Sequence, residues 1–299
     1  MEIPYHNLLA NLKGVFDFQG IASLRQWAPV IIIIGITAGI GSILFCMAIG
    51  WATKFFLGWG AGFTPPVPAS IGDTVITDIG RRWAIPLVTT LGGLVSGLLV
   101  YKFAPETEGH GTDAAIDAFH NKNGVIQKRV PFLKLVASAI TIGSGGSAGK
   151  QGPVALISAG IGSSVARLFK LTAHQRRIAV AVGIGTGIGA IFKAPLGGAI
   201  LSAEILYMHG FESGVIIPSF ISTTIGYSIF ASWQGFTPIF GEHASLVFPR
   251  PPTLLSYAIL GILCGIIGIL YVRTFYGVRN LFRKIKIPNY YKPAIGGLV

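Results

Sequence analysis

The chain has 299 residues and a formal net charge of +12, and charged residues make up only 11% of it. Hydrophobic residues account for 52% of the sequence, and the mean hydropathy is +0.66. A soluble domain carries about 25% charged residues, and a nucleic-acid-binding protein gathers its basic residues on one solvated face. The composition therefore argues against a soluble enzyme, a disordered chain and a partner made of nucleic acid.

Four uncharged tracts separate the charged residues, and each has about the 20 residues that an apolar helix needs to cross a bilayer core. They lie between Arg25 and Lys54, Arg82 and Lys102, Glu212 and Glu242, and Arg250 and Arg273. Backbone N–H and C=O groups find no water in lipid, so an uninterrupted apolar tract favours a helix. The runs 30–34 and 261–270 lack the alternation of a membrane β-strand. We therefore predict an all-α polytopic membrane protein.

Basic residues flank the first and the last of these tracts. Lys13 and Arg25 precede the first, and the cations that follow the last have no acidic residue among them: Arg273, Arg279, Arg283, Lys284 and Lys286. Lys and Arg concentrate in cytoplasmic loops, so we expect a cytoplasmic N-terminal segment over 1–26 in a protein of the cell membrane. Contact with anionic lipid explains the second cluster equally well. No cleaved signal peptide is predicted, because no basic region leads into an apolar core at the start.

Three shorter uncharged segments follow in the middle of the chain, at 135–149, 151–166 and 178–192, and all are rich in Gly, Ser and Ala. Helices of this length reach only about 22–24 Å at 1.5 Å per residue. Short, glycine-interrupted segments are typical of broken helices that end inside the membrane and line a site. The alternative is whole helices whose small residues allow close packing, as the pairs Gly183/Gly187 and Gly185/Gly189 suggest. Both interpretations stay open at this point.

Two short patterns recur along the chain in the same order. Gly35 and Gly39 with their neighbours resemble the stretch from Gly261, and the four residues 92–95 reappear at 296–299. Because many transporters are built from repeats, we predict a first membrane repeat over 27–250 and the truncated start of a second over 251–299. Chance similarity is the alternative, since Gly and Ile are frequent in this chain.

Two glycine-rich loops carry the residues that could bind a ligand. One runs from Gly143 to Pro153 and contains Lys150, and the other covers 109–113; each comes before a helical stretch. Free N–H groups and a partial positive charge of roughly +0.5 at a helix N-terminus favour an anion. Two such termini aimed at one point would hold an anion without a fixed cation. A full positive charge in a low-dielectric site would instead bind the anion too tightly for release. A nucleotide P-loop is excluded, because Ser144 and Gln151 stand where its Gly and its Ser or Thr are needed.

The residues in and after these loops resemble the CLC chloride channel and transporter family. The matching motifs are Gly-His-Gly-Thr-Asp at 109–113, Gly-Lys-Gln-Gly-Pro at 149–153, and Ala-Pro-Leu-Gly-Gly-Ala-Ile-Leu-Ser-Ala-Glu at 194–204. The resemblance implies an all-helical inverted repeat with broken intramembrane helices, a homodimer with one pore in each subunit, and a chain that stops early in its second repeat. It also implies a set of anion-binding residues: Gly109, His110, Gly111, Thr112, Gly149, Lys150, Gln151, Gly152 and Pro153.

The chain departs from the family pattern at two positions that matter for proton coupling. The family's gating glutamate corresponds to Gln151, and its inner proton-transfer glutamate corresponds to Ile205. An amide neither titrates near neutral pH nor carries a charge. We therefore expect passive conduction of chloride or a similar small anion. The alternatives are proton/chloride antiport by a non-standard proton path, and a truncated chain that needs the rest of the second repeat to function.

Two further polar residues invite a role in transport. Glu204 is the only acid between 131 and 209, and we interpret it as a structural carboxylate paired with a helix end or a basic residue, with a proton relay as the alternative. His110 stands where the family often has Ser, so it either contacts the anion and makes conduction sensitive to pH, or caps a helix. No metal-ligand spacing and no catalytic set is found, so we expect no enzyme and no cofactor, and only the anion, membrane lipid and a second subunit as partners.

Overall fold

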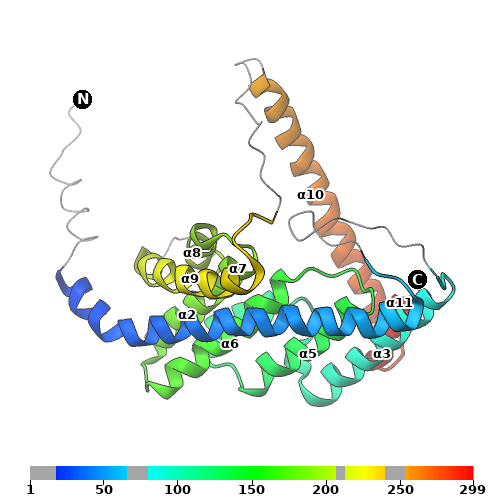
Figure 1. Cartoon of the computed structure of the whole chain (residues 1–299), viewed down its shortest axis with the longest axis horizontal. Helices are drawn as coiled ribbons and strands as arrows, with labels where there is room; N and C mark the ends of the chain where they lie inside the picture. The colour runs from blue at the N-terminus through cyan, green and yellow to red at the C-terminus, as the bar shows by residue number, and fades with distance from the viewer. Residues whose placement is uncertain (1–17, 66–79, 207–212, 240–252, 299) are drawn as a thin grey trace.

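A computed structural model describes residues 18–65, 80–206, 213–239 and 253–298 (Figure 1). Within these ranges every regular element is a helix. The longer helices are α2 (Phe18–Thr53), α3 (Ala84–Phe103), α4 (Thr112–Asn121), α5 (Arg129–Gly143), α6 (Gln151–Leu168), α7 (Ala173–Ile191), α8 (Pro195–Glu204), α9 (Ser213–Gln234) and α10 (Thr253–Lys284). The short elements are a π-helical turn at Lys54–Ala61, 3₁₀ turns at Pro105–Thr107 and Asn289–Tyr291, and α11 (Lys292–Leu298).

Four helical stretches in the described ranges are long and apolar enough to cross a membrane: Trp27–Ala61, Ala84–Phe103, Gly214–Gln234 and Leu254–Lys284. Each of them overlaps one of the four uncharged tracts, so the four predicted tracts are confirmed as helices long and apolar enough to cross a membrane. Helix α2 begins at Phe18, inside the segment 1–26 that we assigned to the cytoplasm, although its apolar span starts only at Trp27. Residues 1–17, and the predicted boundary between the two repeats at 250/251, lie outside the described residues.

Glycines set how closely the central helices approach each other. On α2, a Cβ added to Gly35 would lie 2.9 Å from the Ile225 side chain of α9, and one on Gly39 would lie 3.0 Å from the Gly226 carbonyl oxygen. On α7, Gly183 meets the backbone of Ser158, a residue of α6. Such small residues let helix backbones approach closely. In a membrane this matters because lipid is as apolar as the helices, so no hydrophobic effect drives the helices together. The close-packing interpretation of the glycine pairs is therefore correct for α7.

The central helices also differ in length from one another. At 1.5 Å per residue, α5 reaches about 22 Å and α8 only about 15 Å, so both are shorter than a bilayer core. Helix α7 begins at Ala173, five residues before the apolar segment that we predicted from 178. The cause is a capping box, in which Thr172 accepts from the Gln175 backbone N–H and the Gln175 side chain accepts from the Thr172 N–H. A polar first turn thus lengthens a helix whose apolar part is short.

The core lies between α6 and α7, in each of which most residues are buried. The principal apolar cluster is built around Leu156, Val180 and Ile184, with residues of α2 and α4 packed on it. In contrast, none of the residues in the apolar window of α10 is buried in the structure, and Figure 1 shows the N-terminal half of α10 projecting away from the other helices. The core therefore positions α4 and α6, the helices that follow the two glycine-rich loops.

The two Gly-Gly pairs of the recurring pattern lie at the contact between α3 and α11. A Cβ on Gly93 of α3 would meet the Pro293 carbonyl oxygen, and one on Gly297 of α11 would meet the Thr89 carbonyl oxygen. Both helices therefore need a glycine at the crossing. A Cβ added to Gly261 or Gly265 would meet no atom of another element within 4 Å, so the first pattern has no comparable packing on α10.

Candidate functional site

Helix α4 begins after a loop that only glycine can form. Gly109 and Gly111 have φ values of +79° and +111°, a region that side chains with a Cβ rarely adopt. The backbone then turns into α4 at Thr112, with Asp113 in the first turn. The loop thus presents its N–H groups at the positive end of a helix dipole.

Helix α6 begins after a second glycine-rich loop. Gly145 has a φ of +100°, and the helix starts at Gln151 with Pro153 in its first turn, where a missing N–H is tolerated. Pro153 is buried, whereas Gly149, Lys150 and Gln151 are exposed. The side-chain amide of Gln151 has no hydrogen-bond partner among the described residues, so it is exposed and unpaired at the N-terminus of α6.

The starts of α4 and α6 are in direct contact. A Cβ on Gly152 would overlap the His110 carbonyl group, and a Cβ on Gly111 would lie 2.8 Å from the Gly152 carbonyl oxygen. The structure therefore brings together the two loops that the sequence placed about 40 residues apart. Each helix start carries a partial positive charge, so their juxtaposition concentrates positive potential without a side chain.

His110 is engaged with its own helix. Its Nδ1 accepts the backbone N–H of Thr112 at 3.3 Å, and its Nε2 lies 3.4 Å from the carboxylate of Asp113. Because Nδ1 accepts, the proton of a neutral ring sits on Nε2, where Asp113 can receive it. The His110 side chain therefore contacts the first turn of its own helix.

The two positions next to each other at the end of α8 differ in environment. Ile205 is half-buried and packs against the principal apolar cluster. Glu204 is the last residue of α8 and is exposed. It forms no ion pair and no hydrogen bond with the residues that the structure describes, so the expected pairing with a basic residue is not found there.

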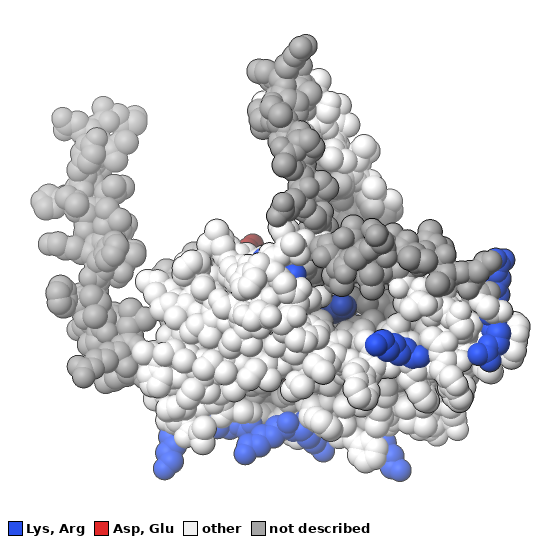
Figure 2. Space-filling view, in the orientation of Figure 1, with Lys and Arg blue, Asp and Glu red and all other residues white. Residues whose placement is uncertain are grey.

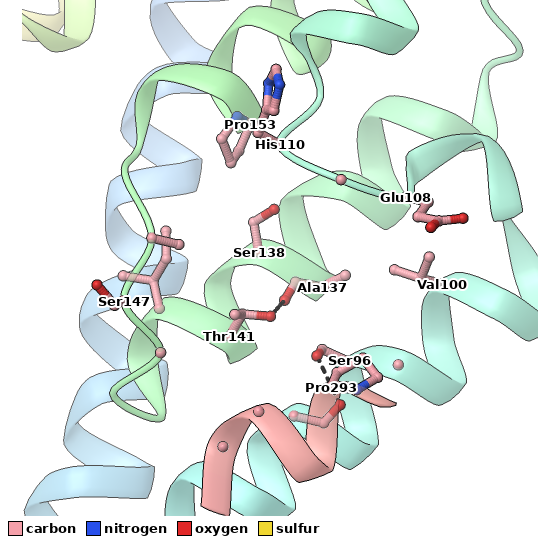
Figure 3. Close-up of a pocket in the computed structure, with 18 of the residues that line it drawn as sticks. Ser96, Val100, Glu108, His110, Ala137, Ser138, Thr141, Ser147, Pro153 and Pro293 are labelled. Carbon is pink, nitrogen blue, oxygen red and sulfur yellow. Dashed lines mark hydrogen bonds between the residues drawn. The ribbon is translucent and has the colours of Figure 1, made fainter. Parts of the chain in front are cut away.

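A cavity of about 720 Å³ lies beside the two helix starts, between α3, α5, α10 and α11. Gly109, His110, Gly149 and Pro153 line one end of it, whereas Lys150 and Gln151 are not part of its wall. Figure 3 shows Ser138 and Thr141 of α5 directed into this space, with His110 and Pro153 near one end and Pro293 near the other. The site is therefore a mostly apolar chamber with a few polar groups in its wall, next to two helix N-termini.

Lys134 of α5 is a site residue that the sequence reasoning missed. Its side chain is 4% exposed, and its Nζ donates to the carbonyl oxygens of Thr107 at 3.0 Å and Gly109 at 2.5 Å. It also lines the cavity. In the sequence, Lys134 is the charged residue directly before the uncharged segment 135–149. The spacing Lys134, Ser138, Thr141 follows one helix face and was the available signal. A buried cation therefore lies next to the first glycine-rich loop.

A comparison with protein families identifies the relationship. The model of the voltage gated chloride channel family matches residues 92–299. The chain belongs to the voltage-gated chloride channel (CLC) family.

Individual relatives agree with this assignment. A protein of Methanocaldococcus jannaschii without a described function is 28% identical over 283 residues, covering 94% of this chain and 63% of that protein. The H(+)/Cl(-) exchange transporter ClcA of Cronobacter sakazakii is 26% identical, covering 91% and 58%. The crystal structure of a slow cyanobacterial Cl⁻/H⁺ antiporter has a TM-score of 0.74 at 23% identity, covering 90% and 62%. The chain thus has the CLC fold and spans less than two thirds of the length of these relatives.

Proposed function

We propose that the protein conducts chloride or a similar small anion passively across a membrane, without coupling to protons. The observation that carries this proposal is the absence of a titratable side chain at the two positions where CLC transporters relay protons. An amide, Gln151, stands open at the head of α6, and Ile205 packs into the apolar cluster at the end of α8. Neither side chain can take up and release a proton near neutral pH.

The anion-binding residues are also proposed. The backbone N–H groups of the loops 109–112 and 149–153 would hold the anion, because both helix starts are adjacent and bring two partial positive charges to one place. Gln151 would act as a gate that never carries a negative charge. Lys150, which is exposed and next to it, would attract anions from the solvent.

The decisive experiment measures the reversal potential of the full chain in liposomes with a chloride gradient. Passive conduction predicts a reversal potential near the chloride Nernst potential, which stays unchanged when a proton gradient is added. A reversal potential displaced by the proton gradient would refute the proposal. Flux without any protein, and flux with protein in symmetric chloride, serve as controls.

The second candidate is proton/chloride antiport through a different proton path. It is favoured by the names of two relatives, an exchange transporter and an antiporter. It is also favoured by Glu204, an exposed carboxylate without an ionic partner in the described ranges. Uphill proton movement driven by a chloride gradient would establish antiport, and its loss in Glu204→Gln would assign the relay.

The third candidate is a chain that transports only together with further sequence. It is motivated by α10, whose apolar window has no buried residue in the structure. Flux by the 299-residue chain alone would exclude this candidate. Flux that requires the second repeat of a family member, supplied in trans, would establish it.

We further propose that the N-terminus is cytoplasmic. Hydrogen bonds join several connections at one end of the helices: Arg129 to Glu106, Arg167 to the Ile126 carbonyl, and Arg176 to the Asn123 carbonyl. If α2 and α3 each cross once, this end lies on the side of the N-terminus. Lys and Arg are enriched on the cytoplasmic side of membrane proteins, and Arg129, Arg167 and Arg176 lie at this end. Figure 2 shows Lys and Arg along the lower edge of the molecule and also at its right side.

The membrane side and the oligomeric state can each be measured. Lys170→Cys, made after both native cysteines are replaced, should react with a membrane-impermeant maleimide only from the cytoplasmic side of vesicles. The homodimer implied by the family resemblance predicts twice the chain mass in detergent, after the detergent contribution is subtracted. Labelling from outside, or a monomer mass at all concentrations, would contradict the respective proposal.

A further inference from the structure

We propose that the connection between α4 and α5 and the connection between α6 and α7 form one basic surface that binds the headgroups of anionic phospholipids. The basic surface consists of five cations: Lys128, Arg167, Lys170, Arg176 and Arg177. The inference rests on the membrane location of the chain and not on the anion conduction proposed above. Its evidence is the convergence of the cations, their lack of acidic partners, and the exposed apolar residues between them.

Hydrogen bonds bring the three arginines to the turn that connects α4 to α5. Arg176 of α7 donates to the Asn123 backbone carbonyl at 2.8 Å, and Arg177 donates to the Asn123 side-chain oxygen at 2.9 Å. Arg167, near the end of α6, donates to the Ile126 carbonyl at 2.9 Å. Two helices that are separate in the sequence thus place their guanidinium groups around a single turn.

The backbone of this turn fixes it against both helices. Asn123 and Gly124 have φ values of +51° and +72°, a left-handed conformation that Gly and Asn adopt most readily. A Cβ on Gly124 would lie 3.1 Å from the Arg177 backbone nitrogen. Ser163 of α6 donates to the Gly124 carbonyl at 2.7 Å and accepts the Ile126 N–H at 3.0 Å. The cations are therefore held at fixed positions relative to one another.

The two lysines complete the basic surface at its exposed side. Lys128 lies two residues after the Ile126 carbonyl that receives Arg167, and the backbone N–H of Lys170 donates to the Arg167 carbonyl at 3.1 Å. Both lysines are exposed, and neither ammonium group has a hydrogen bond with the residues that the structure describes. They are therefore free to meet an anion that approaches from outside.

No acidic residue neutralises the basic surface. The sequence has no Asp or Glu between 118 and 203. The two acids beside these connections already have partners, because Asp117 pairs with Lys122 at 2.7 Å and Glu106 pairs with Arg129 at 3.0 Å. Within the described ranges, no ion pair includes any of the five cations. The basic surface therefore keeps its positive charge for an external partner.

The guanidinium groups also keep donors that suit a phosphate group. Among the described residues, Arg167 and Arg177 each donate through one terminal nitrogen, and Arg176 donates only through Nε. At least one terminal nitrogen of each arginine thus has no partner there. Guanidinium groups match the oxygen atoms of a phosphate group in geometry and in charge. The headgroup phosphate of a phospholipid is a partner of this kind.

Exposed apolar side chains favour a lipid over a soluble polyanion as the partner. Leu168 and Phe169 lie between Arg167 and Lys170 and are 75% and 38% exposed, and Val125 in the turn is 37% exposed. At a bilayer surface such side chains enter the boundary between headgroups and acyl chains, while long cationic side chains reach the phosphates. Anionic lipids concentrate in the cytoplasmic leaflet, which is the side that we propose for this end of the helices.

Local lipid enrichment tests the basic surface. The full chain, with both native cysteines replaced, carries a bimane fluorophore at Val125→Cys and is placed in vesicles of phosphatidylcholine and phosphatidylglycerol. Quenching by phosphatidylglycerol is compared with quenching by phosphatidylcholine, each with the same spin label on its acyl chain. The ratio of the two reports enrichment at this surface alone. Because both leaflets have the same composition, the ratio does not depend on the orientation of the chain.

The double variant Lys128→Gln/Lys170→Gln removes two charges whose side chains hold no described residue in place. We expect phosphatidylglycerol to be enriched at least about tenfold at the parent surface, and the double variant to lower this ratio at least about fivefold, since each cation near an anionic membrane attracts the lipid by about that factor. A ratio near one in the parent, or a ratio that the double variant leaves unchanged, would overturn the proposal. The melting temperature in detergent reports on folding.

Arg82→Gln is the matched control, because Arg82 is exposed but precedes α3, whereas Glu106 and its partner Arg129 follow the other end of this helix. Its ratio should stay within about twofold of the parent, because α3 is about 30 Å long and charges act over only about 10 Å in salt. Equal losses in the control and in the double variant would assign the enrichment to net charge and overturn a local surface.

A soluble phosphate is the rival partner. Glycerol 3-phosphate carries the same phosphate group without acyl chains, and we expect it to leave the lipid quenching unchanged at constant ionic strength. Displacement of phosphatidylglycerol by this probe would overturn the lipid proposal. Leu168→Ser should lower quenching by both lipids, because the apolar contact holds the surface at the bilayer; quenching equal to that of the parent would contradict this contact.

The lipid surface and the proposed function fail in different ways. A chain that passes no chloride, yet enriches phosphatidylglycerol through Lys128 and Lys170, refutes passive conduction and supports the lipid surface. A chain that conducts chloride with a lipid ratio near one supports conduction and overturns the lipid surface.

Discussion

Gly152→Ala tests the contact between the starts of α4 and α6, on which the proposed anion site depends. The added methyl group would overlap the His110 carbonyl oxygen, and it would lie 2.9 Å from the carbonyl carbon and 3.2 Å from the His110 Cβ. These are backbone or near-backbone atoms that no rotamer change can move away. Overpacking of this kind typically destabilises a protein by about 1–3 kcal/mol. The two loops must then separate, so we also expect chloride flux to fall.

The assay combines the melting temperature in detergent with chloride flux in liposomes. Gly149→Ala is the control three residues earlier in the same loop, because its Cβ would meet nothing closer than 3.8 Å, the side chain of Gln151. It should stay within about 0.5 kcal/mol of the parent, as is usual for a substitution on the surface. A Gly152→Ala protein with parent-like stability and flux would show that the two helix starts are not in contact.

Three further changes extend the argument to the gate, a cap and a helix crossing. Gln151→Glu should reduce chloride flux at neutral pH, where a carboxylate competes with the anion, and flux should recover as the pH falls toward about 4.3; a flux without pH dependence would contradict the gating role. Thr172→Ala removes the cap of α7 and should lower stability by about 0.5–2 kcal/mol in denaturation experiments. Gly183→Ala would overlap the Ser158 backbone and should destabilise by about 1–3 kcal/mol, whereas Gly277→Ala, with open space around it, should not.

The spans and the two glycine-rich loops were predictable because their signals are local. An apolar tract of sufficient length must form a helix in lipid, so the tracts before Lys54 and Lys102 became α2 and α3. Glycines with a positive φ, such as Gly109 and Gly145, mark loops that other residues cannot form. The start of α7 was missed, because a capping box is a side-chain signal that an apolar tract does not contain.

Contacts between segments were beyond sequence reasoning. The role of Lys134 depends on two carbonyl groups that lie about 25 residues earlier, and a charge count shows only that the residue interrupts an apolar segment. For Glu204 the sequence favoured an ion pair, but the fold leaves it exposed without one among the described residues. A partner for a charge is chosen by three-dimensional packing, which a linear pattern does not encode.

By itself, the sequence determined that this chain is a helical membrane protein. It also determined that the side chains of Gln151 and Ile205 cannot exchange a proton near neutral pH. These properties follow from residue chemistry and from the solvent around the chain. The tertiary structure alone decided that His110 and Gly152 touch, and that a buried ammonium group faces the adjacent cavity. The reason is that glycines, which have no side chain, allow two helix backbones to touch. Only the folded backbone shows which helices meet at which glycine.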